Sequence, residues 1–107
     1  MPHSFMSEVL KAFRKQIRFT DHAFHAMYSA ERMVTVDEVI EALLAGDVVE
    51  DYADDPRGHS CLVLGYTRAR RPVHVVCAPK DEFLAVITAY EPSLNKWVPD
   101  FKARRKA

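Results

Sequence analysis

The apolar residues of this chain change their spacing at Gly46, and no other feature limits the possible fold so strongly. Before Gly46 they recur every three or four residues, which is the period of an amphipathic helix. After Gly46 they gather into short runs rich in β-branched and aromatic residues, separated by turn-forming residues, as is typical of strands. This order predicts an α+β domain in which two or three N-terminal helices precede a sheet.

The helical half carries its own start signals. A first helix is predicted from Ser7 to Ile17, with the hydroxyl of Ser7 as a cap for free backbone N–H groups. Thr20 gives the same signal for a second helix. The third start is the clearest, because Thr35 and Glu38 have the spacing of a capping box, in which each side chain binds a backbone N–H of the other residue.

Four runs in the second half predict strands, at Val48–Tyr52, Ser60–Tyr66, Val73–Ala78 and Phe83–Tyr90. The loops between them are too short for a parallel crossover, which needs about a dozen residues, so the strands are expected to form an antiparallel meander. The run Val73–Ala78 is apolar on both faces apart from His74, which favours a central position in the sheet.

The chain of 107 residues has the usual length of one domain. We expect residues 1–18 to form an N-terminal helix or extension, residues 19–98 a single α+β domain, and residues 99–107 a basic C-terminal tail. The residues after Pro92 show no regular period, and Trp97 is the expected anchor of that segment.

The net charge is zero, but the charges are unevenly placed. Nine acids and one base lie between Glu31 and Asp55, whereas Arg68 and Arg71 share a predicted turn and Lys96 lies near the end of the chain. A protein polarised in this way can bind a polyanion with one face and a basic partner with the other. The plain alternative is that these charges only keep the surface solvated.

The cysteines and the missing motifs limit the compartment and the chemistry. Cys61 and Cys77 lie in apolar, strand-like runs, which predicts two buried free thiols in a reducing compartment, and no His or Cys cluster nearby predicts a zinc site. No apolar run reaches the roughly 20 residues that cross a bilayer, and residues 1–7 lack the pattern of a secretory signal. The three glycines form no phosphate-binding loop. We expect a cytoplasmic protein that needs no cofactor and contacts no membrane.

Two histidines in the second predicted helix are candidates for proton transfer. His22 falls in the first turn, where the positive end of the helix disfavours imidazolium and so favours the neutral ring that acts as a general base. Packing and hydrogen bonding at a helix start would explain His22 without any chemistry. His25 lies on nearly the same face, but no third ligand accompanies the pair, so a metal site is not expected.

A third histidine and several aromatic residues lie in the strand half. His74 points to the face opposite its valine neighbours, and it meets Tyr90 only in one register of the strands, which the sequence leaves open. Lys96 and Trp97 add a cation and an aromatic surface. Such mixtures of stacking surfaces and cations recognise single-stranded RNA, although Trp97 suits a structural anchor equally well.

Several segments of the chain together resemble one known family. They are His22-Ala23, the helix from Thr35 to Gly46, Val49–Tyr52, Asp54-Asp55-Pro56, Ser60–Gly65, Arg71–Val76, Ile87–Pro92 and Trp97. In this order they resemble the bacterial domain-of-unknown-function family 4258 over about Phe19 to Trp97. The family places an arginine shortly after its His-Ala pair. Arg32 lies near that place but about two residues further from His22, so His25-Ala26 is an alternative match.

The resemblance implies a function as well as a family. Members of the family are often encoded beside a small YgiT-type zinc-finger protein that resembles an antitoxin, which implies the toxin half of a type II toxin–antitoxin pair. The order of helices and strands is similar to that of the RelE and BrnT ribonuclease toxins, which is an analogy of fold. We therefore expect a cofactor-independent RNA endonuclease with a cognate antitoxin as its partner.

The expected site residues supply a titratable ring, a cation or a stacking surface. They are His22, His74, Arg32 and Tyr90 as catalytic residues, His25 as an alternative base, and Lys96, Trp97, Arg68 and Arg71 as RNA-binding residues. An alternative hypothesis, with the oligomeric state open in both, is a non-enzymatic module that docks a basic or zinc-finger partner through its acidic segment from Glu31 to Asp55. The two hypotheses differ in whether the domain has chemistry of its own, and convergence of the candidate residues on one accessible surface would favour the enzyme.

Overall fold

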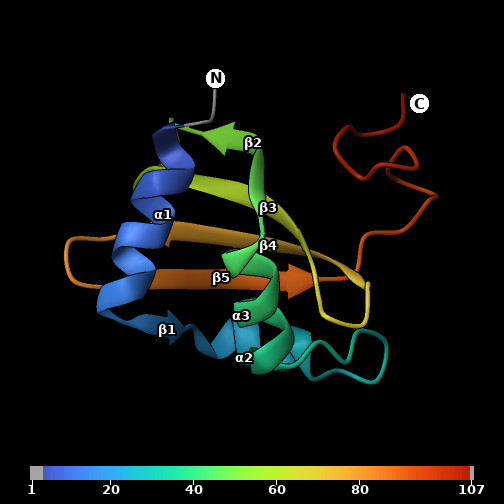
Figure 1. The fold of residues 1–107 in the computed structure, drawn as a ribbon, viewed down its shortest axis with the longest axis horizontal. Helices are drawn as coiled ribbons and strands as arrows, with labels where there is room; N and C mark the ends of the chain where they lie inside the picture. Colours follow the sequence, from blue (N-terminus) through green and yellow to red (C-terminus); the bar gives the residue numbers. More distant parts are fainter. Residues whose placement is uncertain (1–3, 107) are drawn as a thin grey trace.

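Residues 4–106, which the computed structural model describes, fold into three helices and one five-stranded sheet (Figure 1). Residues 1–3 and 107, at the ends of the predicted N-terminal extension and basic tail, lie outside the described residues. The elements are α1 (Ser4–Lys15), β1 (Ile17–Phe19), α2 (Asp21–Met27), α3 (Val36–Leu44), β2 (Asp47–Tyr52), β3 (Ser60–Tyr66), β4 (Pro72–Pro79) and β5 (Leu84–Tyr90). The predicted α+β class is confirmed.

The sheet is mixed, with strand order β1-β5-β4-β3-β2. Strands β2 to β5 form the predicted antiparallel meander, with β4 in the middle, but β1 is an additional edge strand parallel to β5. The prediction of only four, wholly antiparallel strands was therefore wrong. Ile17, predicted to end the first helix, pairs instead with Leu84. A strand of three residues shows no alternation in the sequence, and the partner that stabilises it lies far along the chain.

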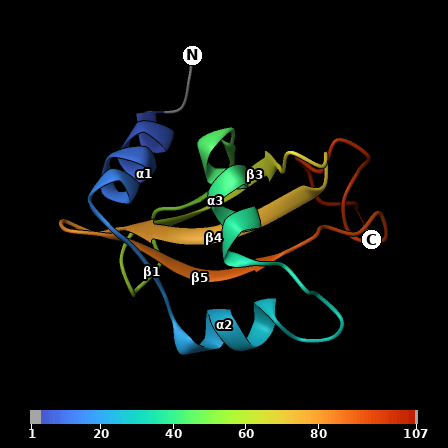
Figure 2. The same cartoon turned by 60° about the horizontal axis from the view of Figure 1, so that its bottom comes forward.

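The core lies between one face of the sheet and the helices α1 and α3. Val63 of β3 and Val75 of β4 are fully buried there, and they belong to the same cluster as Val9 of α1 and Leu43 of α3. Helix α2 packs along β5 and contributes Met27. Figure 2 shows α1 and α3 above the strands and α2 below β5.

Residues 92–106, called the tail from here on, fold back beside the end of β5 (red in Figure 1). The tail holds its shape through an isolated antiparallel bridge between Trp97 and Arg104. Trp97 is only 2% exposed, because it packs against the ring of His74, which alternation along β4 places on the face away from the helices. The prediction of Trp97 as the anchor of this segment is confirmed.

The predicted helix starts are present at α2 and α3. The hydroxyl of Thr20 accepts a hydrogen bond from the backbone N–H of Ala23 at 2.9 Å. Thr35 and Glu38 form both hydrogen bonds of the capping box, at 3.1 Å to the Thr35 hydroxyl and 3.0 Å to the Glu38 carboxylate. These caps satisfy N–H groups that each helix itself leaves without partners, and the cap at Thr35 fixes where the connection between α2 and α3 ends.

Gly65 of β3 lets α3 approach the sheet more closely than any other residue would allow. A Cβ atom at this position would lie 1.9 Å from the backbone oxygen of Ala42 in α3. That distance is far inside van der Waals contact, and the obstructing atom belongs to a helix backbone that cannot rotate away.

We predict that Gly65→Ala lowers the free energy of unfolding by about 3 kcal/mol or more, because α3 must move away from β3. Chemical denaturation followed by circular dichroism measures the change. Ala69→Ser, in the exposed turn of the same hairpin, is the control and should shift stability by no more than about 0.5 kcal/mol. Equal stability of the two variants would contradict the close approach described above.

Candidate functional site

A groove of about 770 Å³ opens where the connection between α2 and α3, the end of β5 and the tail meet. Its lining is mostly polar or aromatic and comprises Ala26, Ser29, Glu31, Arg32, Tyr90, Glu91, Ser93, Lys96, Trp97 and Arg104. Four of the residues proposed from the sequence therefore share this groove, namely Arg32, Tyr90, Lys96 and Trp97. They come from segments that are distant in sequence, so only the fold brings them together.

His74 lies fully buried behind two aromatic residues of the groove. Its Nε2 donates to the carbonyl oxygen of Phe101 at 2.9 Å. Because a carbonyl only accepts, Nε2 carries the proton, and Nδ1 is free to accept from the hydroxyl of Tyr90 at 3.3 Å. Burial lowers the pKa of His74, so the neutral ring with this tautomer is favoured at neutral pH.

Tyr90 links this histidine to the groove. Its side chain is half-buried at the end of β5, and its ring meets the His74 ring edge-on, with 5.3 Å between the centroids. Burial raises the pKa of the Tyr90 phenol, with Arg104 and Arg32 opposing that change and Glu50 adding to it. The phenol is therefore protonated at neutral pH and acts as a hydrogen-bond donor rather than as a ready base.

Arg32 is held at both its side chain and its backbone. Its Nη1 donates to the hydroxyl of Thr88 at 3.1 Å, and its guanidinium lies over the Tyr90 ring, 5.5 Å from the centroid. Its carbonyl oxygen accepts from Nη2 of Arg71 at 2.9 Å. These contacts present a fixed cation to the groove, and none of the partners of the Arg32 guanidinium named here is an acid.

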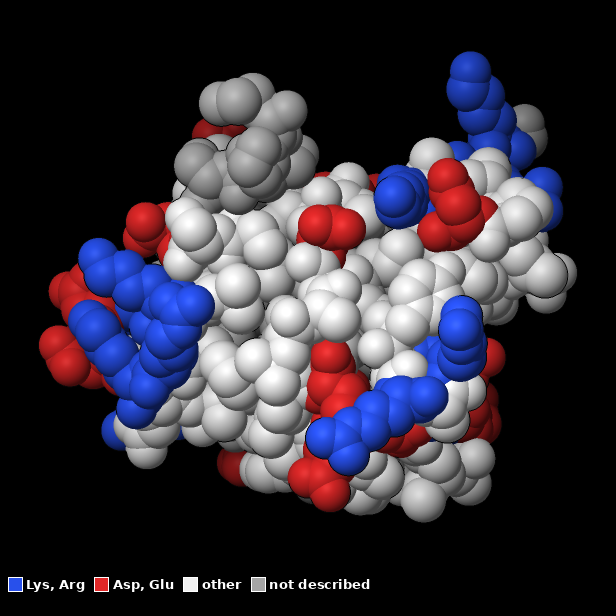
Figure 3. Space-filling view, in the orientation of Figure 1, with Lys and Arg blue, Asp and Glu red and all other residues white. Residues whose placement is uncertain are grey.

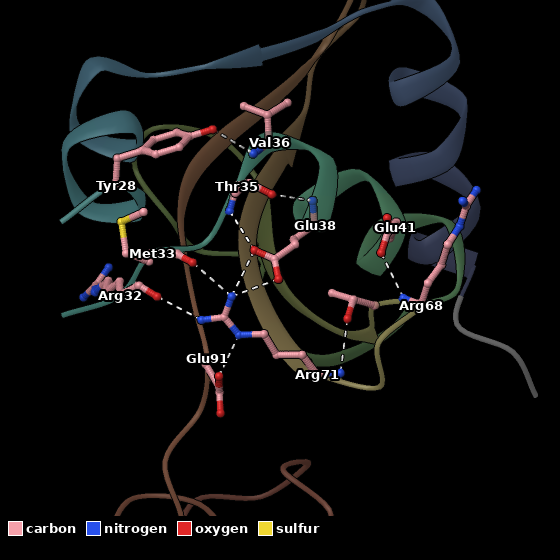
Figure 4. A network of polar contacts seen from close by, with 11 residues as sticks. Tyr28, Arg32, Met33, Thr35, Val36, Glu38, Glu41, Arg68, Arg71 and Glu91 are labelled. Atoms are coloured by element: carbon pink, nitrogen blue, oxygen red, sulfur yellow. Dashed lines mark hydrogen bonds and ion pairs between the residues drawn. The ribbon is translucent and has the colours of Figure 1, made fainter. Parts of the chain in front are cut away.

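Arg71 is the centre of the polar network in Figure 4. Its Nη1 donates to the carbonyl oxygen of Met33 at 3.0 Å and to both carboxylate oxygens of Glu38 at 2.9 Å, and its Nε donates to Glu91 at 2.7 Å. The carboxylates raise the pKa of Arg71. The structure thus places Arg71, predicted to bind RNA, where it ties α3, the α2–α3 connection and the end of β5 to one another.

Three further predicted residues lie away from the groove. His22 lines a separate cavity of about 310 Å³ with Lys80 and Arg57, and His25 is exposed on α2. Arg68 is exposed in the turn between β3 and β4, where its backbone N–H donates to Glu41 at 2.9 Å. The structure therefore does not bring His22 together with His74.

Arg104 is a groove residue that the sequence did not identify. Its Nε and Nη2 donate to the two carboxylate oxygens of Glu50 at 2.9 and 3.1 Å, and its guanidinium lies 4.7 Å from the centroid of Trp97. The hydroxyl of Tyr52 also donates to Glu50. Burial, followed by this contact with Glu50, raises the pKa of Tyr52 to about 12. Glu50 and Tyr52 share a face of β2 by alternation, but Arg104 has no local pattern that marks it.

Other features of the described residues concern the cysteines, the helices and possible metal ligands. Cys61 and Cys77 are buried free thiols, as expected, and the strand register pairs them across β3 and β4. No helix among the described residues is long and apolar enough to cross a membrane. Within residues 4–106, no group of three His, Cys, Asp or Glu side chains has the arrangement of a metal site.

We predict that Arg71→Lys lowers the free energy of unfolding by about 1–3 kcal/mol. A lysine keeps the charge but cannot donate at once to the carboxylates of Glu38 and Glu91 and to the two backbone carbonyls that Arg71 binds. Thermal and chemical unfolding measure the loss. Arg70→Lys makes the matched control, since Arg70 is the exposed neighbour in the same turn and should change little. An unchanged unfolding midpoint in Arg71→Lys would show that the network adds no stability.

We also predict a loss of stability as the pH falls below 6.5, the ordinary pKa of histidine. The lowered pKa of His74 means that the unfolded chain binds a proton more readily, so this contribution is complete above pH 6.5 and is lost as the pH falls toward the folded-state pKa. Carboxylates with lowered pKa values, such as Glu38, change the stability only below about pH 4.5, where the unfolded chain begins to bind their protons. Denaturation at several pH values between about 5 and 7 should give a flatter profile for His74→Gln than for the wild type. Parallel profiles would refute this role of His74.

Comparison with known proteins adds one positive finding. A family model described as a domain of unknown function, DUF4258, matches residues 19–91, from β1 to the residue after β5. No curated protein and no solved structure matches the chain. The matched residues include Arg32, His74 and Tyr90, whereas Lys96, Trp97 and Arg104 lie beyond them in the tail. Because the match covers more than half of its length, the chain belongs to the DUF4258 family.

Proposed function

We propose that this protein is a metal-independent RNA endonuclease and that the groove between β5 and the tail is its site. One observation carries the proposal: Arg32, Tyr90, Lys96 and Arg104 line the same groove, with His74 directly behind it. Cations for phosphates, an aromatic surface and a neutral histidine are the groups that cleavage of RNA by its own 2′-hydroxyl requires.

The groove suits a flexible, negatively charged strand. Arg32, Lys96 and Arg104 supply cations around it, and the half-buried Tyr90 ring offers a surface on which a base can stack. Trp97 is too deeply buried to serve as an open stacking platform, so its ring forms part of the wall. Figure 3 shows basic side chains at both ends of the molecule, over α1 and the β4–β5 hairpin and again near the tail.

The chemistry follows from the hydrogen bond between Tyr90 and His74. The 2′-hydroxyl gives its proton to the Tyr90 oxygen while Tyr90 passes its own proton to Nδ1 of His74. The new bond between the 2′-oxygen and phosphorus replaces the bond to the 5′-oxygen, which leaves with a proton from water. The products are a 2′,3′-cyclic phosphate and a 5′-hydroxyl end. His74 then returns its proton to solvent through Tyr90.

The surrounding charges stabilise the charged groups that form during this reaction. Arg32 and Lys96 offset the charge that builds on the phosphate oxygens. Glu50 opposes the effect of burial on His74, so the imidazolium that forms during the reaction has a carboxylate nearby. The nucleophile belongs to the RNA itself, so apart from water the scheme draws only on groups of the chain and the substrate.

The biological setting that we propose is that of a type II toxin, held inactive by a cognate antitoxin of the YgiT zinc-finger kind and active in the cytoplasm. The support is the family membership and an analogy of fold, since helices followed by an antiparallel meander also describe RelE and BrnT toxins. The analogy motivates the assay with ribosomes described below.

The alternative of an acidic docking surface has less support. Of the nine acids between Glu31 and Asp55, five already bind partners inside the protein, namely Glu38, Glu41, Glu50, Asp51 and Asp55. On the face shown in Figure 3, acidic side chains lie scattered beside basic ones rather than in one patch. A basic partner would therefore meet few acids that are free to bind it.

We predict that the purified protein cleaves free RNA in a buffer that contains EDTA, and RNA on ribosomes in the magnesium buffer that keeps them assembled. Tyr90→Phe should lower the rate about 100-fold or more, because it keeps the ring but removes the hydroxyl that relays the proton. Arg32→Ala should cause a similar loss of rate, because it removes a cation that offsets the charge on the phosphate oxygens. Gel analysis of the 5′ ends and growth after induction are the two measurements.

His22→Ala is the matched control for this experiment, because His22 lies in a different cavity and should leave both cleavage and growth arrest unchanged. Intact RNA in every assay of the wild-type protein would refute the proposed activity. Full activity of Tyr90→Phe together with loss of activity in His22→Ala would move the site away from this groove.

A further inference from the structure

Two arginine–aromatic pairs flank His74 on the groove side. Arg32 lies over Tyr90, and Arg104 lies over Trp97, at 5.5 and 4.7 Å from the ring centroids. Both rings meet the His74 ring edge-on, with centroid distances of 5.3 and 4.4 Å. The groove therefore has two cationic positions, one on each side of the group to which the proton transfer is assigned.

The two positions come from different parts of the chain. Arg32 and Tyr90 lie within residues 19–91, which match the family model, whereas Trp97 and Arg104 belong to the tail. The tail is folded rather than loosely attached, since Val98 N–H donates to the Ala103 carbonyl at 3.0 Å and Arg105 N–H to the Lys96 carbonyl at 2.8 Å. One wall of the groove thus comes from residues outside the segment that the family model matches.

Arg104 combines a fixed orientation with access to solvent. Glu50 of β2 holds it through two hydrogen bonds, and Tyr52 in turn holds Glu50. The Arg104 side chain nevertheless remains 59% exposed, and it lines the groove. A guanidinium oriented in advance loses little conformational entropy when it binds a phosphate, and its planar fork matches phosphate oxygens. Since Glu50 offsets the charge of Arg104, this position acts through directed hydrogen bonds, with Lys96 adding net charge beside it.

We infer that Arg32 and Arg104 hold successive phosphates of a single RNA strand, so that the tail builds a second phosphate subsite and the groove selects oligonucleotides over mononucleotides. The inference rests on the proposed function and names its substrate class. Tyr90 lies against Arg32 and lines the same groove as Arg104, so a strand that contacts both arginines also passes the proton relay. A ligand with one phosphate can fill only one of the two positions.

The experiment measures how affinity depends on the number of phosphates. Two probes are used, a 2′-O-methyl uridine dinucleotide with one phosphodiester and a trinucleotide with two; the methyl group blocks the nucleophile, so cleavage does not interfere. Trp97 is the single tryptophan of the chain and lies against Arg104, so its fluorescence follows the titration. We expect the wild-type protein to bind the trinucleotide about 10-fold or more tightly than the dinucleotide.

Arg104→Ala should abolish this gain, and Arg104→Gln, which keeps a donor for Glu50 and so keeps the tail in place, should do the same. Arg105→Ala is the matched control, because the neighbouring Arg105 donates to the Leu94 carbonyl and is not part of the groove lining. It should keep the gain. Arg32→Ala should weaken the binding of both probes.

If the trinucleotide binds more tightly than the dinucleotide by the same factor in the wild type and in both Arg104 variants, the second subsite is refuted, whereas the proposed cleavage is not. If Arg105→Ala and Arg104→Ala reduce the preference for the trinucleotide equally, the second subsite is also refuted, because the preference would then depend on overall charge. If neither probe binds the wild-type protein, RNA recognition by this groove fails, and the proposed function fails with it.

Discussion

The side chain of Arg71 joins three parts of the fold, namely α3, the connection between α2 and α3, and the end of β5. It binds the carboxylate of Glu38, which also closes the capping box at the start of α3, and it binds Glu91 at the end of β5. It also holds the carbonyl oxygens of Arg32 and Met33, whose connection has no regular structure of its own. Met33 has a positive φ of 41°, a conformation that a non-glycine residue keeps only when its surroundings hold it there. This guanidinium therefore fixes the backbone from which the Arg32 side chain enters the groove.

The fold could be predicted from the sequence wherever the pattern was local. The capping box at Thr35, the run Ser60–Tyr66 and the central place of β4 each follow from residues that are neighbours in the chain. The edge strand β1 could not be predicted in this way, because three residues carry no period and Ile17 also fits the apolar face of a helix. Its pairing with β5 is a tertiary interaction that overrides local preference.

The residues of the candidate site also differ in whether local pattern or long-range contacts determine their place. Tyr90 and His74 were expected to meet if the register allowed it, and the register pairs these two residues directly. His22 has a favourable place at a helix start, but the fold turns that end of α2 toward another cavity. Arg104 stood in a run of basic residues, and only the return of the tail to Glu50 distinguishes it from its neighbours. A long-range ion pair of this kind leaves no trace in local spacing.

The parallel pairing of β1 with β5 has a consequence for the order of folding. The sheet cannot be completed by neighbouring hairpins alone, because its edge strand, near the start of the described chain, must meet the last strand of the meander. Closing so large a loop costs entropy before it gains contacts, and topologies of this kind fold slowly. The groove draws on Ala26 at one extreme and Arg104 at the other, so it forms only after the helical half and the tail have both docked on the sheet. Folding intermediates with a partial sheet would therefore lack the groove, which makes it a late product of the folding pathway.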